Sequence, residues 1–166
     1  MLTFRDAAAE DAGLISRINA ASWRTCYRGL ISDDYLSRLP DEYWTPSVRA
    51  WLGSGQMSGT IALRDGVPVG AVLFGRGRDE RYGSYGEVVS LYVLPDHTRS
   101  GVGSLLLTEA LRSLKEDGYD RFYLWAIDGN APADKFYRKH GFRRTEDRVP
   151  YRIGGQDVTD ICYVRP

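Results

Sequence analysis

Residues Glu87 to Glu109 read EVVSLYVLPDHTRSGVGSLLLTE, and this stretch decides the fold. It combines an apolar strand, a short polar turn containing Gly101 and Gly103, and the start of a helix. The first N–H groups of a helix have no partner within the helix, and glycine lets a ligand approach them closely. Because the helix dipole also favours an anion there, the stretch predicts a site for a phosphorylated ligand.

Two other interpretations of the glycine pair have to be weighed. Glycines before a helix also occur in ordinary strand-to-helix turns, so the spacing alone leaves this alternative open. A dinucleotide-binding fold of the NAD type would need a third glycine three residues after Gly103 and would place the turn after the first strand. Leu106 stands at that position, and several predicted strands precede the turn, which disfavours this class.

The stretch resembles the signature of the GNAT superfamily of N-acetyltransferases, in which Q/R-x-x-G-x-G/A follows a strand. Residues 98–103 match from the fourth position onward, with Thr98 where the family usually has Gln or Arg, and Arg99 one place later. A second family block, N-x-x-A-x-x-F-Y-x-x-x-G-F, is matched from Asn130 to Phe142. Two blocks in the family's order identify the chain as a member by resemblance.

The resemblance implies acetyl-CoA as cosubstrate, with its pyrophosphate on the glycine turn and its pantetheine arm paired with the preceding strand. The cofactor-binding residues predicted in this way are Leu91, Tyr92, Val93, Arg99, Ser100, Gly101, Val102, Gly103, Ser104, Asn130, Ala133 and Tyr137. Arg99 is expected to supply the cation that Thr98 does not. Asn130 also suits a helix N-cap, and the side chains of residues 91–93 also suit a core.

An amine acceptor needs a base, because a primary amine with a pKa of about 10.4 is almost wholly protonated at neutral pH. The resemblance implies that Glu87 draws this proton through water and that Tyr137 protonates the leaving thiolate. The plainer alternatives are a solvated carboxylate at a strand start for Glu87 and an aromatic core residue for Tyr137. The expected function is acetyl transfer to a primary amine of a small molecule or protein, and a non-catalytic acyl-CoA-binding regulatory module is the alternative.

Aromatic and acidic residues of the first helices fall in the region that shapes the acceptor pocket of the family. The aromatic residues are Trp23, Tyr27, Tyr35, Trp44 and Trp51, and the acids able to hold a cation are Asp33, Asp34 and Glu42. Packing and a solvated surface explain these residue types equally well. The sequence therefore leaves the identity of the amine open.

Periodicity predicts alternating strands and helices along the chain. Strands are expected at 2–5, 60–63, 67–74, 85–94, 121–127, from 142 and at 156–164, and helices at 9–27, 32–39, 41–52, 101–117 and 130–140. Residues 75–86 are expected to be a long, poorly ordered crossing. The resemblance implies one α/β domain over residues 1–166, with a seven-stranded, mostly antiparallel mixed sheet splayed between its fourth and fifth strands and four to five flanking helices.

Composition sets the remaining expectations. The 22 basic and 22 acidic residues balance, so no global field favours nucleic acid or a membrane surface as a partner. Cys26, Cys162, His97 and His140 lack metal-ligand spacing, so no metal is expected, and both thiols are expected to be buried and reduced. With no signal-like start and no apolar run of about 20 residues, a cytoplasmic location is expected. The family and the aromatic content suggest a homodimer.

Overall fold

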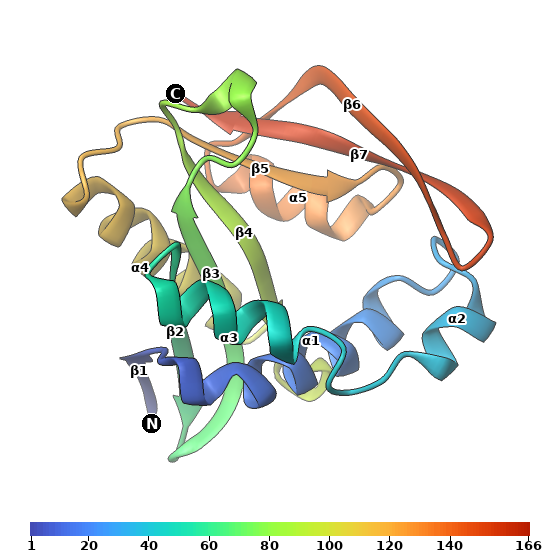
Figure 1. Cartoon of the computed structure of the whole chain (residues 1–166), viewed down its shortest axis with the longest axis horizontal. Helices are drawn as coiled ribbons and strands as arrows, with labels where there is room; N and C mark the ends of the chain where they lie inside the picture. The colour runs from blue at the N-terminus through green and yellow to red at the C-terminus, as the bar shows by residue number, and fades with distance from the viewer.

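The strands of the computed structural model, which describes residues 1–166, form one mixed sheet in the order β1-β2-β3-β4-β5-β7-β6 (Figure 1). Their bounds are β1 (Leu2–Asp6), β2 (Met57–Arg64), β3 (Val67–Arg76), β4 (Gly86–Val93), β5 (Phe122–Ile127), β6 (Arg143–Ile153) and β7 (Gln156–Arg165). Only the β4–β5 pairing is parallel. The seven-stranded, mostly antiparallel sheet is therefore confirmed.

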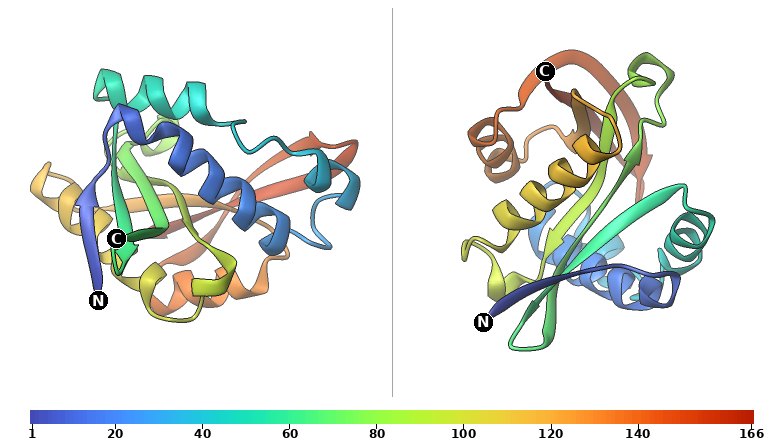
Figure 2. Two further views of the ribbon diagram at one scale, coloured as in Figure 1. Left: turned by 90° about the horizontal axis from the view of Figure 1, so that it is seen from below. Right: turned by 90° about the vertical axis from the view of Figure 1, so that its left-hand side faces the viewer.

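Five α-helices cover both faces of this sheet. They are α1 (Ala12–Cys26), α2 (Asp33–Arg38), α3 (Thr45–Ser54), α4 (Val102–Glu116) and α5 (Ala131–Lys139). Helices α1 and α3 pack on one face, whereas α4 and α5 lie on the other (Figure 2). None of these helices is long and apolar enough to cross a membrane.

Helix α4 is fixed to the sheet by its apolar stripe. Val102, Leu106, Ala110 and Leu114 recur at helical spacing and are all buried in the largest core cluster. Fully burying a leucine side chain contributes about 1.5–3 kcal/mol, so this stripe holds the helix firmly. The start of α4 is thereby held beside the end of β4.

The sheet opens between β4 and β5, as Figure 1 shows. These strands pair only at Gly86 with Phe122 and at Glu87 with Tyr123. The register of β4 against β3 then shifts, which leaves Val89 as an extra residue in a β-bulge. A bulge bends its strand and increases the local twist, so β4 turns away from β5 beyond this point. The expected splay is confirmed.

Beyond the bulge, alternate backbone groups of β4 face the opening. The N–H of Leu94 donates to the carbonyl of Val69 at 2.8 Å, which fixes the alternation of this antiparallel ladder. Tyr92 therefore bonds to β3, whereas the N–H groups of Leu91 and Val93 point toward the splay. The Val93 carbonyl already accepts from the Ser22 hydroxyl at 3.0 Å.

The prediction of a long, poorly ordered crossing at residues 75–86 is wrong. Strand β3 continues to Arg76, and residues Glu80–Tyr82 form a 3-10 helix. The segment is tied to the sheet because the N–H of Asp79 donates to the Tyr123 hydroxyl at 3.1 Å and Arg78 pairs with Glu87. Tyr123 is far from Asp79 in sequence, and Arg78 meets Glu87 through polar groups, so apolar periodicity could not indicate either contact.

The expectation for the two thiols is half wrong. Cys162 is buried on β7, but Cys26 is exposed at the last turn of α1, and both cysteines are free. The spacing of the buried Ile18 and Ser22 continues to Cys26, so helical periodicity also predicts burial there. Its exposure depends on what packs against the end of α1, which periodicity does not indicate.

The tip of the β6–β7 hairpin packs against the loop and helix that follow α1. Gln156 donates through its side-chain amide to the Leu30 carbonyl at 3.1 Å. The turn uses Gly154 at φ +59° and Gly155 at φ +77°. Tyr35 of α2 lies directly against Gly154, so a Cβ added there would come within 2.5 Å of the Tyr35 Cβ.

Replacing Gly154 by alanine is expected to destabilise the protein by about 2–4 kcal/mol, which combines the left-handed backbone penalty with overpacking against Tyr35. Gly155→Ala is the matched control, because it has a similar φ but no atom within 4 Å of the added Cβ. It should lose only about 1–2 kcal/mol. Urea unfolding measures both changes, and equal losses would contradict close packing of this hairpin on α2.

Candidate active site

The turn between β4 and α4 forms a cradle of unpaired backbone N–H groups. Arg99 at φ +58° and Gly101 at φ +87° reverse the chain, and Gly101 is the N-cap of α4. The first bond into the helix runs from the N–H of Leu105 to the Gly101 carbonyl at 3.1 Å, so the N–H groups of residues 102–104 have no acceptor within the chain. Such N–H groups can bind an anion, so the geometry is compatible with the phosphate site that the glycine pair predicts, which stays a prediction.

The side chains of the cradle are mostly occupied. The Ser100 hydroxyl donates to the His97 carbonyl, and Val102 is buried in the core. The Ser104 hydroxyl is 2.9 Å from Nε2 of His140, and burial lowers the pKa of this histidine, which favours its neutral form. Ser100, Val102 and Ser104 therefore offer backbone N–H groups rather than side chains.

Two arginines accompany the cradle. Arg99 is exposed and forms no ion pair, as its predicted role requires. Arg64 of β2, which sequence reasoning missed, donates from Nη2 to the Ser100 hydroxyl at 3.3 Å, and its buried Nε has no acceptor. The Thr98 hydroxyl only donates to the Pro95 carbonyl, at 3.0 Å. Arg64 lies too far from the motif in sequence for the spacing to have shown it.

Asn130 and Ala133 begin α5 and bond to each other. The N–H of Ala133 donates to the Asn130 side-chain oxygen at 3.3 Å, which makes Asn130 the N-cap of the helix. Its amide nitrogen remains available as a donor. Asn130 therefore caps α5 through its side-chain oxygen, and its amide nitrogen can still make the predicted contact with a ligand.

A cavity of about 310 Å³ lies at the splay. It is enclosed by α1, β4, β5 and the β6–β7 hairpin. The lining residues are Trp23, Tyr27, Arg78, Asp79, Glu87, Val89, Tyr92, Trp125, Ala126, Ile127, Val149, Tyr151 and Asp160. A pocket of this size and largely apolar lining suits a small organic molecule.

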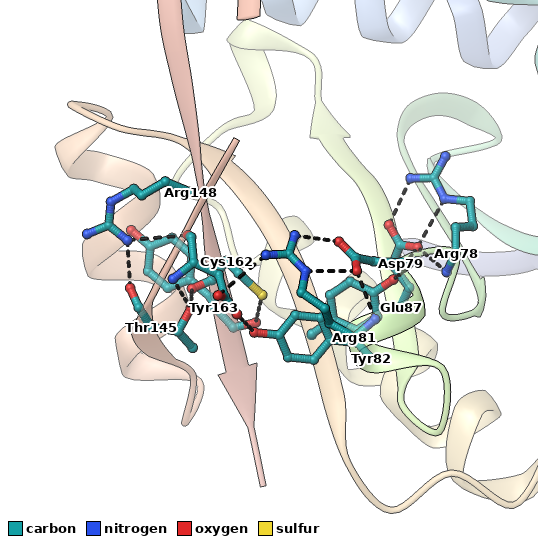
Figure 3. A network of polar contacts seen from close by, with 11 residues as sticks. Arg78, Asp79, Arg81, Tyr82, Glu87, Thr145, Arg148, Cys162 and Tyr163 are labelled. Atoms are coloured by element: carbon teal, nitrogen blue, oxygen red, sulfur yellow. Dashed lines mark hydrogen bonds and ion pairs between the residues drawn. The ribbon is translucent and has the colours of Figure 1, made fainter. Parts of the chain in front are cut away.

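Glu87 is part of this cavity and is only 2% exposed, which excludes the solvated carboxylate. Its Oε1 accepts from the N–H of Arg78 at 3.2 Å, from Nε of Arg78 at 3.0 Å and from the Tyr123 hydroxyl at 2.9 Å. Its Oε2 accepts only from Nη2 of Arg78, at 2.8 Å (Figure 3). A carboxylate oxygen has two acceptor positions, so Oε2 retains one.

Tyr137 lies on α5 among aromatic side chains. Its ring contacts those of Phe136, Phe142 and Tyr163. Burial, with a further contribution from the Tyr92 hydroxyl, raises the pKa of Tyr137 well above its ordinary value. The hydroxyl therefore stays protonated at neutral pH. Tyr92 lines the cavity, whereas Tyr137 is not among the lining residues.

The aromatic residues expected in the acceptor region divide into two groups. Trp23 and Tyr27 line the cavity, and the Tyr27 and Tyr92 hydroxyls are 2.9 Å apart. Burial raises the pKa of Tyr92 to about 12. Trp44 and Trp51 pack instead against the core under α1 and α3, and Tyr35 packs against the hairpin.

The structure does not bring the expected acids to the cavity. Asp33 is exposed, Asp34 pairs with Arg38 at 3.3 Å, and Glu42 pairs with Arg17 at 2.8 Å. Sequence reasoning missed the acids that do line it. The sequence did contain an indication of Asp160. This charged residue stands between Val158 and Cys162 on the same face of β7, and both of these neighbours are buried.

Comparison with protein families finds a match over residues 22–142 to the acetyltransferase (GNAT) family. A Bacillus subtilis protein named uncharacterized N-acetyltransferase YuaI is 30% identical over 97% of this chain and 91% of its own length. The spermidine N(1)-acetyltransferase of Thermoplasma acidophilum is 24% identical over 86% of this chain and 88% of its own length.

Solved structures share the same fold. The PaiA N-acetyltransferase of Thermoplasma acidophilum in complex with coenzyme A has a TM-score of 0.80 at 21% identity, covering 99% of this chain and 98% of that chain. YncA of Salmonella typhimurium, solved with acetyl-CoA, has a TM-score of 0.75 at 22% identity, covering 99% and 92%.

Proposed function

The chain belongs to the acetyltransferase (GNAT) family, and on this premise we propose that it transfers the acetyl group of acetyl-CoA to a primary amine by direct attack in a ternary complex. The observation that carries the proposal is the splay of β4 and β5, because the N–H cradle directly follows β4 and the cavity is lined by residues of both strands. A non-catalytic acyl-CoA-binding module would need the cradle alone. The buried Glu87 and the protonated Tyr137 favour the enzyme.

The residues around the splay suit acetyl-CoA as the cosubstrate. We assign the pyrophosphate to the N–H groups of Val102, Gly103 and Ser104, with Arg99 as the nearby cation. The pantetheine amides would bond to the open backbone edge at Leu91 and Val93, as an added strand does. This arrangement would direct the thioester toward the cavity.

The proposed reaction removes two protons from the ammonium ion and supplies one to sulfur. The first proton would pass through water to the remaining acceptor position on Glu87 Oε2, which leaves a neutral amine. The amine nitrogen bonds to the thioester carbonyl carbon, and the C–S bond breaks as the Tyr137 hydroxyl donates its proton to the leaving sulfur. The second proton, which the nitrogen loses as the amide forms, would return the tyrosine to its protonated form.

The names of the relatives give several acceptors, so the family alone does not select one. Besides the spermidine acetyltransferase, they include a mycothiol acetyltransferase matched over 42% of this chain and an N-alpha-acetyltransferase matched over 44%. We therefore propose a small-molecule or peptide amine as the acceptor. A narrower substrate class has to be argued from the residues that line the cavity.

Acetyl-CoA is expected to raise the thermal midpoint, because a ligand that binds only the native state stabilises it by about 2.7 kcal/mol at a hundredfold excess over Kd. Gly103→Val should abolish this shift by placing a branched side chain in the cradle, while its Cβ meets only ordinary contacts with Phe136. Leu105→Val is the control, because Leu105 is exposed on the same turn. An unchanged shift in Gly103→Val would place the ligand elsewhere.

Tyr137→Phe is expected to lower turnover by roughly 10 to 10³-fold with near-normal acetyl-CoA affinity, because it removes the proton donor and keeps the ring packing. Release of CoA under saturating substrates measures the turnover. Tyr163→Phe serves as the control, because it removes a neighbouring hydroxyl that bonds to Asp134 at 2.7 Å. Undiminished turnover in Tyr137→Phe would make Tyr137 a packing residue.

Glu87→Gln is expected to be slow near neutral pH and to recover as the pH rises toward the pKa of the amine, where the nucleophile is already neutral. A pH–rate profile measures this change. If Glu87 only orients the acceptor, KM for the amine should rise with turnover largely kept. A profile parallel to that of the wild type without either change would contradict both roles.

A further inference from the structure

The charged side chains that line the cavity are unequally compensated. Glu87 pairs with Arg78, and Asp79 binds Arg81 through both carboxylate oxygens, at 3.0 and 2.8 Å. Asp160 has no cationic partner within 4.0 Å. Of the three carboxylates in the lining, Asp160 alone carries an uncompensated charge.

Asp160 lies on β7 and is partly buried. The only hydrogen bond to its carboxylate comes from the Tyr151 hydroxyl of β6, at 3.0 Å, and the Tyr92 hydroxyl of β4 is the other titratable group facing it. Burial raises the pKa of this carboxyl above its ordinary value. Desolvating a carboxylate without a counter-ion is unfavourable, so a cation beside it would relieve that cost.

The surroundings of Asp160 in the cavity are aromatic. Trp23 comes from α1, Tyr27 directly follows this helix, Tyr92 comes from β4 and Tyr151 from β6. The Trp23 and Tyr27 rings meet edge to face with their centroids 5.0 Å apart. Aromatic faces attract alkylammonium ions, and a carboxylate supplies the directed partner.

We propose that Asp160 binds the ammonium group of the acceptor, and that the acceptor is a small monoamine with an apolar or aromatic body. This inference rests on the proposed function and specifies its substrate class. A polyamine would need a second uncompensated carboxylate in the cavity. An amino acid would need a free cation, but the lining offers only Arg78, which is paired with Glu87.

Binding of a probe amine tests the proposal in the presence of CoA. 2-Phenylethylamine should bind the wild type in calorimetric titration, whereas the uncharged 2-phenylethanol and the dication 1,4-diaminobutane should bind at least about 10-fold more weakly, as expected for a charge-assisted contact. Failure of 2-phenylethylamine to bind, or preference for either comparison compound, would overturn the proposal.

Asp160→Asn should weaken 2-phenylethylamine binding about 10- to 100-fold, because it removes the charge and keeps an acceptor for Tyr151. Asp160→Glu should restore part of the affinity. Asp157→Asn is the control, because Asp157 lies on the same strand but is exposed and paired with Arg152 at 2.9 Å. Equal amine affinity in Asp160→Asn and the wild type would overturn the proposal.

Unfolding free energy provides a readout independent of activity. The folded pKa of Asp160 is raised, so its ionisation penalises the native state as the pH rises above the unfolded pKa of about 3.9. Asp160→Asn should therefore be more stable than the wild type at pH 7, and this gain should vanish below about pH 4. A loss of stability at pH 7 would contradict the uncompensated charge at Asp160 from which the proposal is argued.

The proposed acetyl transfer and the assignment of Asp160 can be disproved separately. If acetyl-CoA does not shift the thermal midpoint, the proposed function fails whatever Asp160 does. If acetyl-CoA binds and amines are acetylated, but Asp160→Asn keeps the amine affinity of the wild type, only the assignment of Asp160 fails. Turnover with 2-phenylethylamine that falls in Asp160→Asn through KM more than through kcat supports a binding role.

Discussion

The separation of β4 from β5 is the constraint on which the site depends. Backbone N–H and C=O groups inside a protein need partners, and two adjacent strands normally supply them to each other. Here the bulge at Val89 ends this exchange after two residue pairs. The N–H groups of Leu91 and Val93 are then left without a strand partner, and the same divergence accompanies the cavity between α1 and the hairpin.

The two residue pairs that still join β4 to β5 have to stay together although the strands separate beyond them. Glu87 sits at the last paired position, where Tyr123 and Arg78 together bond to both of its oxygens. Tyr123 also accepts from the N–H of Asp79, so one buried hydroxyl joins β4, β5 and the 77–85 segment. A buried ion pair offers little net stability but penalises alternative arrangements, because breaking it strands a buried charge. This network fixes where the strands part.

Features determined by local chemistry could be predicted from the sequence. The glycine turn and the Asn130 cap each follow from a few adjacent residues, and the structure contains both. The order of residues 75–86 could not be predicted, because Arg78 and Glu87 meet only once β3 and β4 have paired. Arg64 was missed for the same reason: the pairing of β1, β2 and β3 brings it to the cradle.

Local charge, not total charge, explains how such a site would bind each of its two substrates at a different position. The chain is neutral overall, yet the α4 N-terminus with Arg99 and Arg64 is positive, and Asp160 leaves the cavity negative. An anionic cosubstrate is favoured at the cradle and a cationic acceptor at the cavity. Each would be disfavoured at the other's position, so one opening in a sheet can bind both in a single orientation.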